Sequence, residues 1–112
     1  MVYSGKLRDD LNDRLFEAIL SLKDVDECYR FFEDISTVSE LRSLAQRLEV
    51  AKMLEANRTY GDIAGKTGAS TATISRVKRC LNYGADGYKL VLSRLSDPKP
   101  LAEDKKIDEV NE

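Results

Sequence analysis

Hydroxyl and cationic side chains gather in one short stretch of the chain, and no acidic residue occurs from Ser70 to Ala85. Small and hydroxyl side chains near the start of a helix can approach base edges, while arginines suit guanine edges or phosphates. The stretch therefore predicts contact with double-stranded DNA. The same residues also fit an amphipathic helix with a solvated basic face, which is the alternative interpretation. The polar residues of the stretch are Ser70, Thr71, Ser75, Arg76, Lys78 and Arg79.

The spacing of small and apolar residues around this stretch is that of a helix-turn-helix at about residues 59–82. The fifth position of the first helix must be small, and Ala64 is there. Gly68 follows four residues later, where the turn requires a positive φ. Ile74 and Val77 come six and nine residues after Gly68 and should point inward. This pattern predicts that the second helix enters the DNA major groove.

Two kinds of DNA contact are expected from the outward side chains. Thr59 and Lys78, with nearby backbone amides, are expected to hold phosphates and to set the register. A protein-interaction module, in which the same basic face binds an acidic protein partner, is the alternative function. The residues expected at base edges are Ser70, Thr71, Ala72, Ser75, Arg76 and Arg79.

Length and composition indicate one all-α domain. The chain has 112 residues, of which 42% are hydrophobic and 34% charged. The two prolines, Pro98 and Pro100, lie near the C-terminus, and β-branched runs of period two are absent. We expect a helical domain over residues 1–96 and an acidic, disordered tail over residues 97–112. The net charge is −2, so the positive field must be local to the proposed recognition helix.

Helix start signals and apolar periodicity predict the remaining elements. A first helix is expected over about residues 6–22, and capping boxes at Asp24, Thr37 and Thr59 open three more. The helix from Thr37 to about Ala56 is apolar on more than one side, so it must be buried on several sides. A homodimer with a shared core would complete that burial. The helix after Asp24 is expected to bury Val25, Cys28, Tyr29, Phe32 and Ile35, and a last helix should span about residues 86–95.

Several classes of function are disfavoured by the composition. The chain has no histidine and only two cysteines, Cys28 and Cys80, which argues against a zinc site or a disulfide framework. We identify no catalytic or metal-binding residues, and therefore no enzyme and no cofactor. No secretory or membrane-spanning segment is visible, so we expect a cytoplasmic protein with reduced thiols. Cys80 is expected to be a small buried residue.

The order of helices and four sequence blocks carry a family resemblance. The blocks are LSLKD, ECYRFFEDI, LAQRLEVAKML and TGASTATISRVKRCLNYG. With them the chain resembles the tryptophan repressor (TrpR) superfamily, and more closely its YerC/YecD-type branch of TrpR-related proteins, over roughly Leu7 to Leu95. The resemblance implies a six-helix, intertwined homodimer that binds operator-like DNA. It implies a bacterial transcriptional regulator, expected to be a repressor, in the cytoplasm at the nucleoid.

The same resemblance bears on the effector. In the repressor two arginines sandwich the indole ring of tryptophan; Arg76 in ATISR matches the second. Arg47 in QRLEVA resembles the first arginine only if one residue is missing from the following helix or turn. Without that gap, Gln46 falls at the position of the first arginine. The repressor has glycine where this chain has Val77, whose branched side chain should intrude on the pocket. We therefore expect that tryptophan is not the corepressor; binding without a ligand and binding with another effector both remain open.

Overall fold

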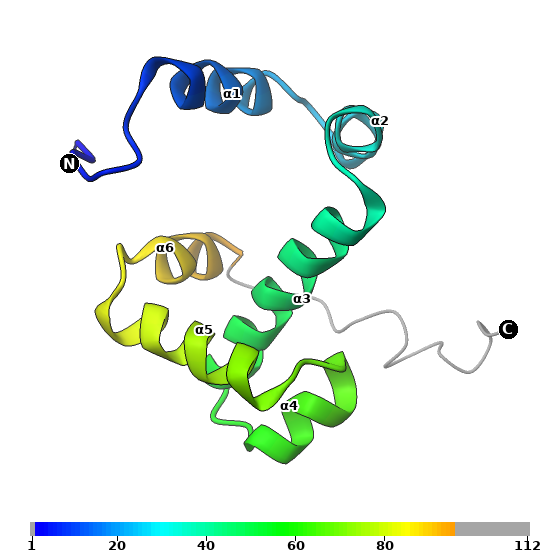
Figure 1. Ribbon diagram of the computed structural model, residues 1–112, viewed down its shortest axis with the longest axis vertical. Helices are drawn as coiled ribbons and strands as arrows, with labels where there is room; N and C mark the ends of the chain where they lie inside the picture. Colours follow the sequence, from blue (N-terminus) through cyan, green and yellow to red (C-terminus); the bar gives the residue numbers. More distant parts are fainter. Residues whose placement is uncertain (1, 96–112) are drawn as a thin grey trace, which may run out of the picture. The chain divides into compact units, whose positions relative to one another are not determined.

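The computed structural model describes residues 2–95, which form six α-helices and no strand (Figure 1). The all-α prediction with six helices is thereby confirmed for this part of the chain. The predicted tail at residues 97–112 lies outside the described residues. The helices are α1 (Asp10–Leu20), α2 (Val25–Ile35), α3 (Val38–Glu55), α4 (Tyr60–Thr67), α5 (Thr71–Tyr83) and α6 (Gly87–Arg94).

The described part of the chain divides into two compact units, and the boundary falls within α3, between Leu44 and Ala45. The first unit has well-defined helix starts. The Asp24 carboxylate accepts the backbone N–H of Glu27 at 2.9 Å, and the Glu27 carboxylate accepts that of Lys23 at 2.8 Å. The Thr37 hydroxyl accepts the backbone N–H of Glu40 at 3.0 Å, and the Glu40 carboxylate accepts the backbone N–H of Thr37 at 2.9 Å. These side chains satisfy N–H groups that have no partner within a helix.

The first helix begins later than predicted, at Asp10 instead of Lys6. Asp9 accounts for the difference, because its side chain accepts the backbone N–H of Asn12 at 2.7 Å and caps the helix there. Apolar periodicity alone does not reveal such a cap. Helix boundaries in this unit are therefore decided by carboxylates and hydroxyls.

The apolar side chains of α1 and α2 remain uncovered within this chain. Neither helix contains a buried residue. Leu20 is 83% exposed, Val25 69% and Tyr29 66%. The prediction that α2 buries Val25, Cys28, Tyr29 and Ile35 is thus wrong for the single chain, and Phe32 is only partly buried. Amphipathic spacing identifies the apolar side of a helix but not the surface that covers it.

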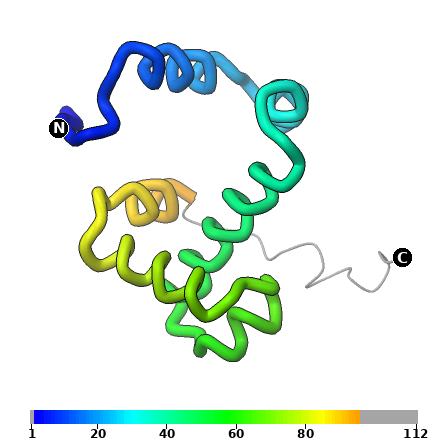
Figure 2. The backbone as a smooth tube through the Cα atoms, viewed as in Figure 1, coloured from blue at the N-terminus to red at the C-terminus, as the bar shows by residue number. Residues whose placement is uncertain are grey.

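The second unit has a closed core, built from the C-terminal half of α3 and from α4 and α5. Leu54, Tyr60, Ala64, Tyr88 and Leu92 pack against it, so that α6 also contributes. Figure 2 follows the chain through α4, the short turn and α5. The buried residues are Val50, Ala51, Met53, Ile63, Ala69, Ile74, Val77 and Leu81.

Two details near the end of α5 differ from expectation. The helix ends at Tyr83, beyond the predicted limit of about residue 82, and α6 begins at Gly87 instead of about residue 86. Cys80 is exposed, which contradicts its assignment as a buried residue. The reason is its place on the helix: Val77 and Leu81 point into the core, and Cys80 lies on another side.

Candidate nucleic-acid interface

The turn between α4 and α5 is fixed by backbone geometry. Gly68 ends α4 with φ 76°, in the left-handed region that favours glycine. Its N–H donates to the Ala64 carbonyl at 2.9 Å. The Thr67 hydroxyl donates to the Ile63 carbonyl at 2.7 Å and accepts the N–H of Ala69 at 3.1 Å. The predicted positive φ at Gly68 is confirmed.

A side chain from the long helix ties this turn to the core. Gln46 on α3 donates from Nε2 to the Thr67 carbonyl at 3.0 Å. The carbonyl belongs to the last turn of α4, where backbone acceptors have no partner within the helix. The bond therefore fixes the end of α4 relative to α3. Sequence reasoning considered Gln46 only as an alternative to Arg47, and the contact spans 21 residues.

The inward side of α5 is apolar as predicted. Ile74 is 0% exposed and Val77 1%, and Leu81 joins them. They meet Ile63 of α4 and Val50 of α3 in one cluster. Burying these five large apolar side chains stabilises the unit by about 1.5–3 kcal/mol each. The helix-turn-helix thus has its own core, which orients the opposite side of α5 toward solvent.

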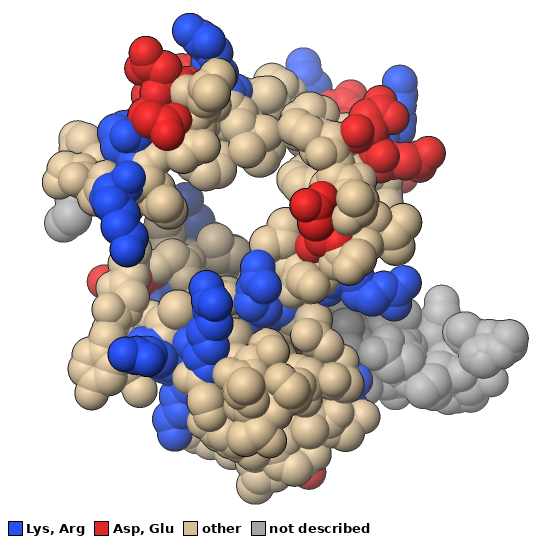
Figure 3. Space-filling view, viewed as in Figure 1, with Lys and Arg blue, Asp and Glu red and all other residues tan. Residues whose placement is uncertain are grey.

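The outward side of α5 carries the predicted polar and cationic residues. Lys and Arg side chains gather over α5 on the face shown in Figure 3. Within residues 2–95, neither Arg76 nor Arg79 forms an ion pair, so their charges are available to a ligand. All eight residues predicted to contact DNA are exposed: Thr59, Ser70, Thr71, Ala72, Ser75, Arg76, Lys78 and Arg79.

Two of the predicted hydroxyls also cap helices. Ser70 accepts the N–H of Thr73 at 3.1 Å and opens α5. Thr59 accepts the N–H of Asp62 at 3.1 Å and opens α4. Their positions are therefore set by the helices themselves. A hydroxyl held in this way has one fixed location relative to the backbone N–H groups of the first helical turn.

One contact at this surface was not predicted. The Lys78 ammonium lies 5.9 Å from the centre of the Tyr60 ring, which joins α5 to the first residue of α4. The spacing of 18 positions gives no helical or strand signal. It arises only when α4 and α5 cross, so sequence reasoning identified Lys78 but missed Tyr60.

The three residues predicted to line an effector pocket differ in how deeply they are buried. Arg76 is exposed on α5, and Arg47 is partly buried on α3. Val77 is almost completely buried and belongs to the core cluster. The structure therefore assigns Val77 a packing role. Among the described residues, no three His, Cys, Asp or Glu side chains are arranged to hold a metal ion, and no helix has the length and apolar character for a membrane span.

Comparison with known proteins agrees with this architecture. The model of the family "Trp repressor protein" matches residues 11–96. YerC of Bacillus subtilis (strain 168) is 62% identical over 92 residues, which cover 82% of this chain and 88% of YerC. The crystal structure of a TrpR-like protein from Eubacterium eligens ATCC 27750 is 62% identical and has a TM-score of 0.79, with 84% and 97% of the two chains covered.

A second solved structure gives the same result. The crystal structure of a putative Trp repressor from Staphylococcus aureus is 53% identical and has a TM-score of 0.78, with 80% of this chain and 90% of that chain covered. The family model alone spans residues from α1 to the end of α6, including the helix-turn-helix. The chain therefore belongs to the Trp repressor family, a family of helix-turn-helix DNA-binding regulators.

Proposed function

We propose that this protein is a sequence-specific, homodimeric transcriptional regulator, a repressor, which places α5 in the major groove of DNA. One observation carries the proposal: α5 is apolar on its buried side and cationic on its exposed side, with no acidic residue from Ser70 to Ala85. The turn at Gly68 presents this exposed side to solvent. Such a regulator acts in the cytoplasm, at the nucleoid.

The exposed residues divide by the contacts that they would make. Small side chains in the first turns of α5 lie where a recognition helix approaches base edges, and Arg76 and Arg79 have the reach for guanine. Each good base contact supplies about 1–3 kcal/mol of discrimination against a wrong base. Lys78 and Thr59 would bind phosphates, and such contacts make the affinity fall steeply with salt.

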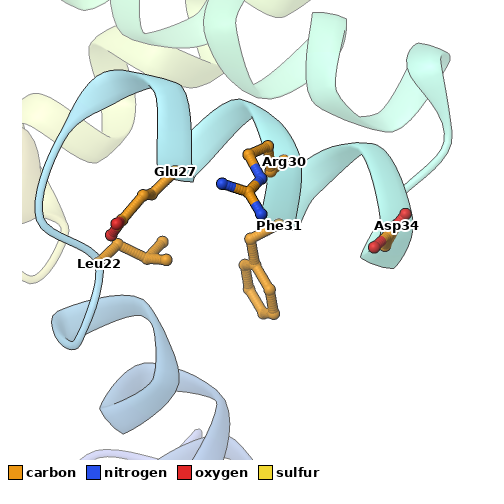
Figure 4. Close-up of a pocket in the computed structure, with 5 residues that line it drawn as sticks. All are labelled: Leu22, Glu27, Arg30, Phe31 and Asp34. Atoms are coloured by element: carbon orange, nitrogen blue, oxygen red, sulfur yellow. The ribbon is translucent and has the colours of Figure 1, made fainter.

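The uncovered side chains of the first unit support a homodimer. Exposed large apolar residues recur along α1 and α2, including Phe16, Leu20, Val25 and Tyr29. Figure 4 shows how Leu22 and Phe31 point toward an open cavity of about 330 Å³, which Glu27, Arg30 and Asp34 also line. A second copy that packs against these helices would remove the apolar surface from water. Two recognition helices, one helical turn of DNA apart, would then read successive major grooves.

The position of Val77 supports the proposal that tryptophan is not the corepressor. Its side chain is 1% exposed and fills part of the core between α4 and α5. In the repressor a glycine at this position leaves room for the indole ring beside the arginine, and here a branched side chain stands there. Overpacking of a filled core costs about 1–3 kcal/mol. Titration calorimetry with L-tryptophan should accordingly detect no micromolar binding; a micromolar dissociation constant would overturn this part of the proposal.

The proposal as a whole is tested by DNA selection followed by binding measurements. Fragments are selected from random and genomic DNA, and the affinity for the best fragment is then measured at moderate salt. Arg76→Glu with Arg79→Glu should weaken binding more than about 100-fold, because two attractive contacts become repulsive. The matched control is Arg42→Glu with Lys89→Glu, which makes the same change in charge at exposed positions of α3 and α6.

The control should bind within about threefold of the wild type. Equal losses in both double variants would mean that only net charge matters, and would argue against recognition by α5. No selected fragment at all, together with capture of an acidic protein through the same arginines, would favour the protein-interaction module instead.

A further inference from the structure

The contact between Tyr60 and Lys78 places a rigid ring beside a flexible cation. The Lys78 nitrogen lies 5.9 Å from the ring centre, within the distance of about 6 Å at which an aromatic face attracts an ammonium group. Tyr60 itself is partly buried and packs against the core cluster of the second unit. The ring is therefore held by the core, while the ammonium group that it contacts remains at the exposed surface.

A lysine that binds a phosphate must give up much of its rotamer freedom. This loss weakens binding unless the side chain is already restricted in the free protein. The Tyr60 ring supplies such a restriction for Lys78. Within residues 2–95 Lys78 forms no salt bridge, so its charge is not neutralised by a carboxylate of the same chain.

The acidic residue of the first turn of α4 is paired. The Asp62 carboxylate lies 3.4 Å from Nε of Arg58. Its backbone N–H is bonded to the Thr59 hydroxyl. The Arg58 guanidinium offsets the negative charge of Asp62, which would otherwise repel a phosphate near the start of this helix.

We propose that Tyr60 is a positioning residue: its ring preorganises the Lys78 ammonium for contact with a DNA phosphate. The inference rests on the proposed DNA-binding function and extends it to a residue that touches no base. The aromatic ring is the essential feature of Tyr60, and its hydroxyl is dispensable.

Four variants of the full chain test this role with the selected DNA fragment: Tyr60→Phe, Tyr60→Leu, Lys78→Gln and the double variant Y60L/K78Q. Tyr60→Phe keeps the ring and should bind like the wild type. Tyr60→Leu should lose about fivefold in affinity for a dimer with two such contacts. Lys78→Gln should reduce the slope of log affinity against log salt by about 2, since two phosphate contacts are lost.

The decisive comparison is the effect of Tyr60→Leu on DNA affinity in the wild-type protein and in the Lys78→Gln variant. If the ring acts through Lys78, Tyr60→Leu should have almost no further effect once Lys78 is glutamine. A merely structural role would lower the melting temperature and weaken binding equally in both backgrounds, and that result would overturn the inference. So would an unchanged affinity of Tyr60→Leu. Failure of the wild type to bind any DNA would instead refute the proposed function.

A second measurement uses the wild-type protein without DNA, with Tyr60→Phe as a conservative control. In the free wild-type protein, an aromatic ring close to the Lys78 side chain should shift its ε-methylene proton resonances upfield of those of the other lysines. Tyr60→Phe should keep the shift. Resonances at the ordinary lysine position would overturn the inference.

Discussion

The two units of the described chain contain similar helices but use their apolar residues differently. In the unit that ends at Leu44, α1 and α2 bury no residue, and Leu20 is 83% exposed. In the unit that begins at Ala45, α3, α4 and α5 enclose eight buried residues. Both units have side chains that cap their helices. Helix-capping side chains are therefore present both in the unit whose apolar residues are exposed and in the unit whose apolar residues are buried.

This difference separates two sources of stability. Capping and periodicity specify where a helix begins and which side is apolar, at about 1 kcal/mol for a cap. A core requires that other elements cover the apolar side, and that burial is the dominant favourable term in folding. The second unit supplies its own cover. The apolar side chains of the first unit are exposed in the single chain, and the proposed dimer would cover them.

The largest expected effect comes from removing that external cover. Val25→Asp with Tyr29→Glu should not weaken α2 itself, because aspartate has about the helix propensity of valine and glutamate a better one than tyrosine. Acids near the start of the helix also suit its dipole. In a symmetric dimer four buried side chains would be lost, each worth about 1.5–3 kcal/mol. Dimer association should fall more than about 1,000-fold, as measured by sedimentation equilibrium. Glu17→Gln, an exposed polar change on α1, is the control; dissociation in both proteins, or in neither, would contradict the proposed interface.

An intermediate effect is expected in the closed core. Ile74→Ala removes a fully buried side chain at the centre of the second unit and should lower the free energy of unfolding by about 2–5 kcal/mol. The neighbouring Ser75→Ala lies on the exposed side of α5 and should change it by less than about 0.5 kcal/mol. Urea unfolding of the two variants provides the comparison. Similar values for both would mean that the core is not closed around α5.

The smallest effect concerns the turn. Gly68→Ala places a Cβ on a residue with φ 76° and should destabilise by about 1–2 kcal/mol. Gly65→Ala, three residues earlier in α4, meets no atom within 4 Å and should stabilise by about 0.5–1 kcal/mol. Thermal unfolding should therefore shift in opposite directions. Shifts of the same sign would refute the assignment of Gly68 as the left-handed residue of the turn.

The fold and the candidate interface were predictable from the sequence to different depths. Spacing alone predicted the small Ala64, the turn at Gly68 and the inward Ile74 and Val77, because these depend on helix geometry within a few residues. Exposure of the DNA-contact candidates followed from the same geometry. Their contact with DNA stays a prediction. The uncovered α2 was not predicted, because a periodic pattern does not state whether the covering surface belongs to the same chain.

The contacts that were missed join different elements. Gln46 bonds the Thr67 carbonyl, and Lys78 meets the Tyr60 ring, across 21 and 18 positions of the chain. Both depend on how α4 crosses its neighbours, which no local pattern encodes. The only local signal is that Gln46 carries an amide donor, and the carbonyls at the C-terminal end of a helix need donors.

The space around Gly68 and its backbone conformation together determine which residue could replace it. No atom lies within 4 Å of the place where a Cβ would stand, so the position has ample room for a side chain. The position requires a residue that tolerates positive φ. L-amino acids resist this conformation, and D-amino acids favour it. A protein made by chemical ligation with D-alanine at position 68 should keep the turn and lose less backbone entropy on folding.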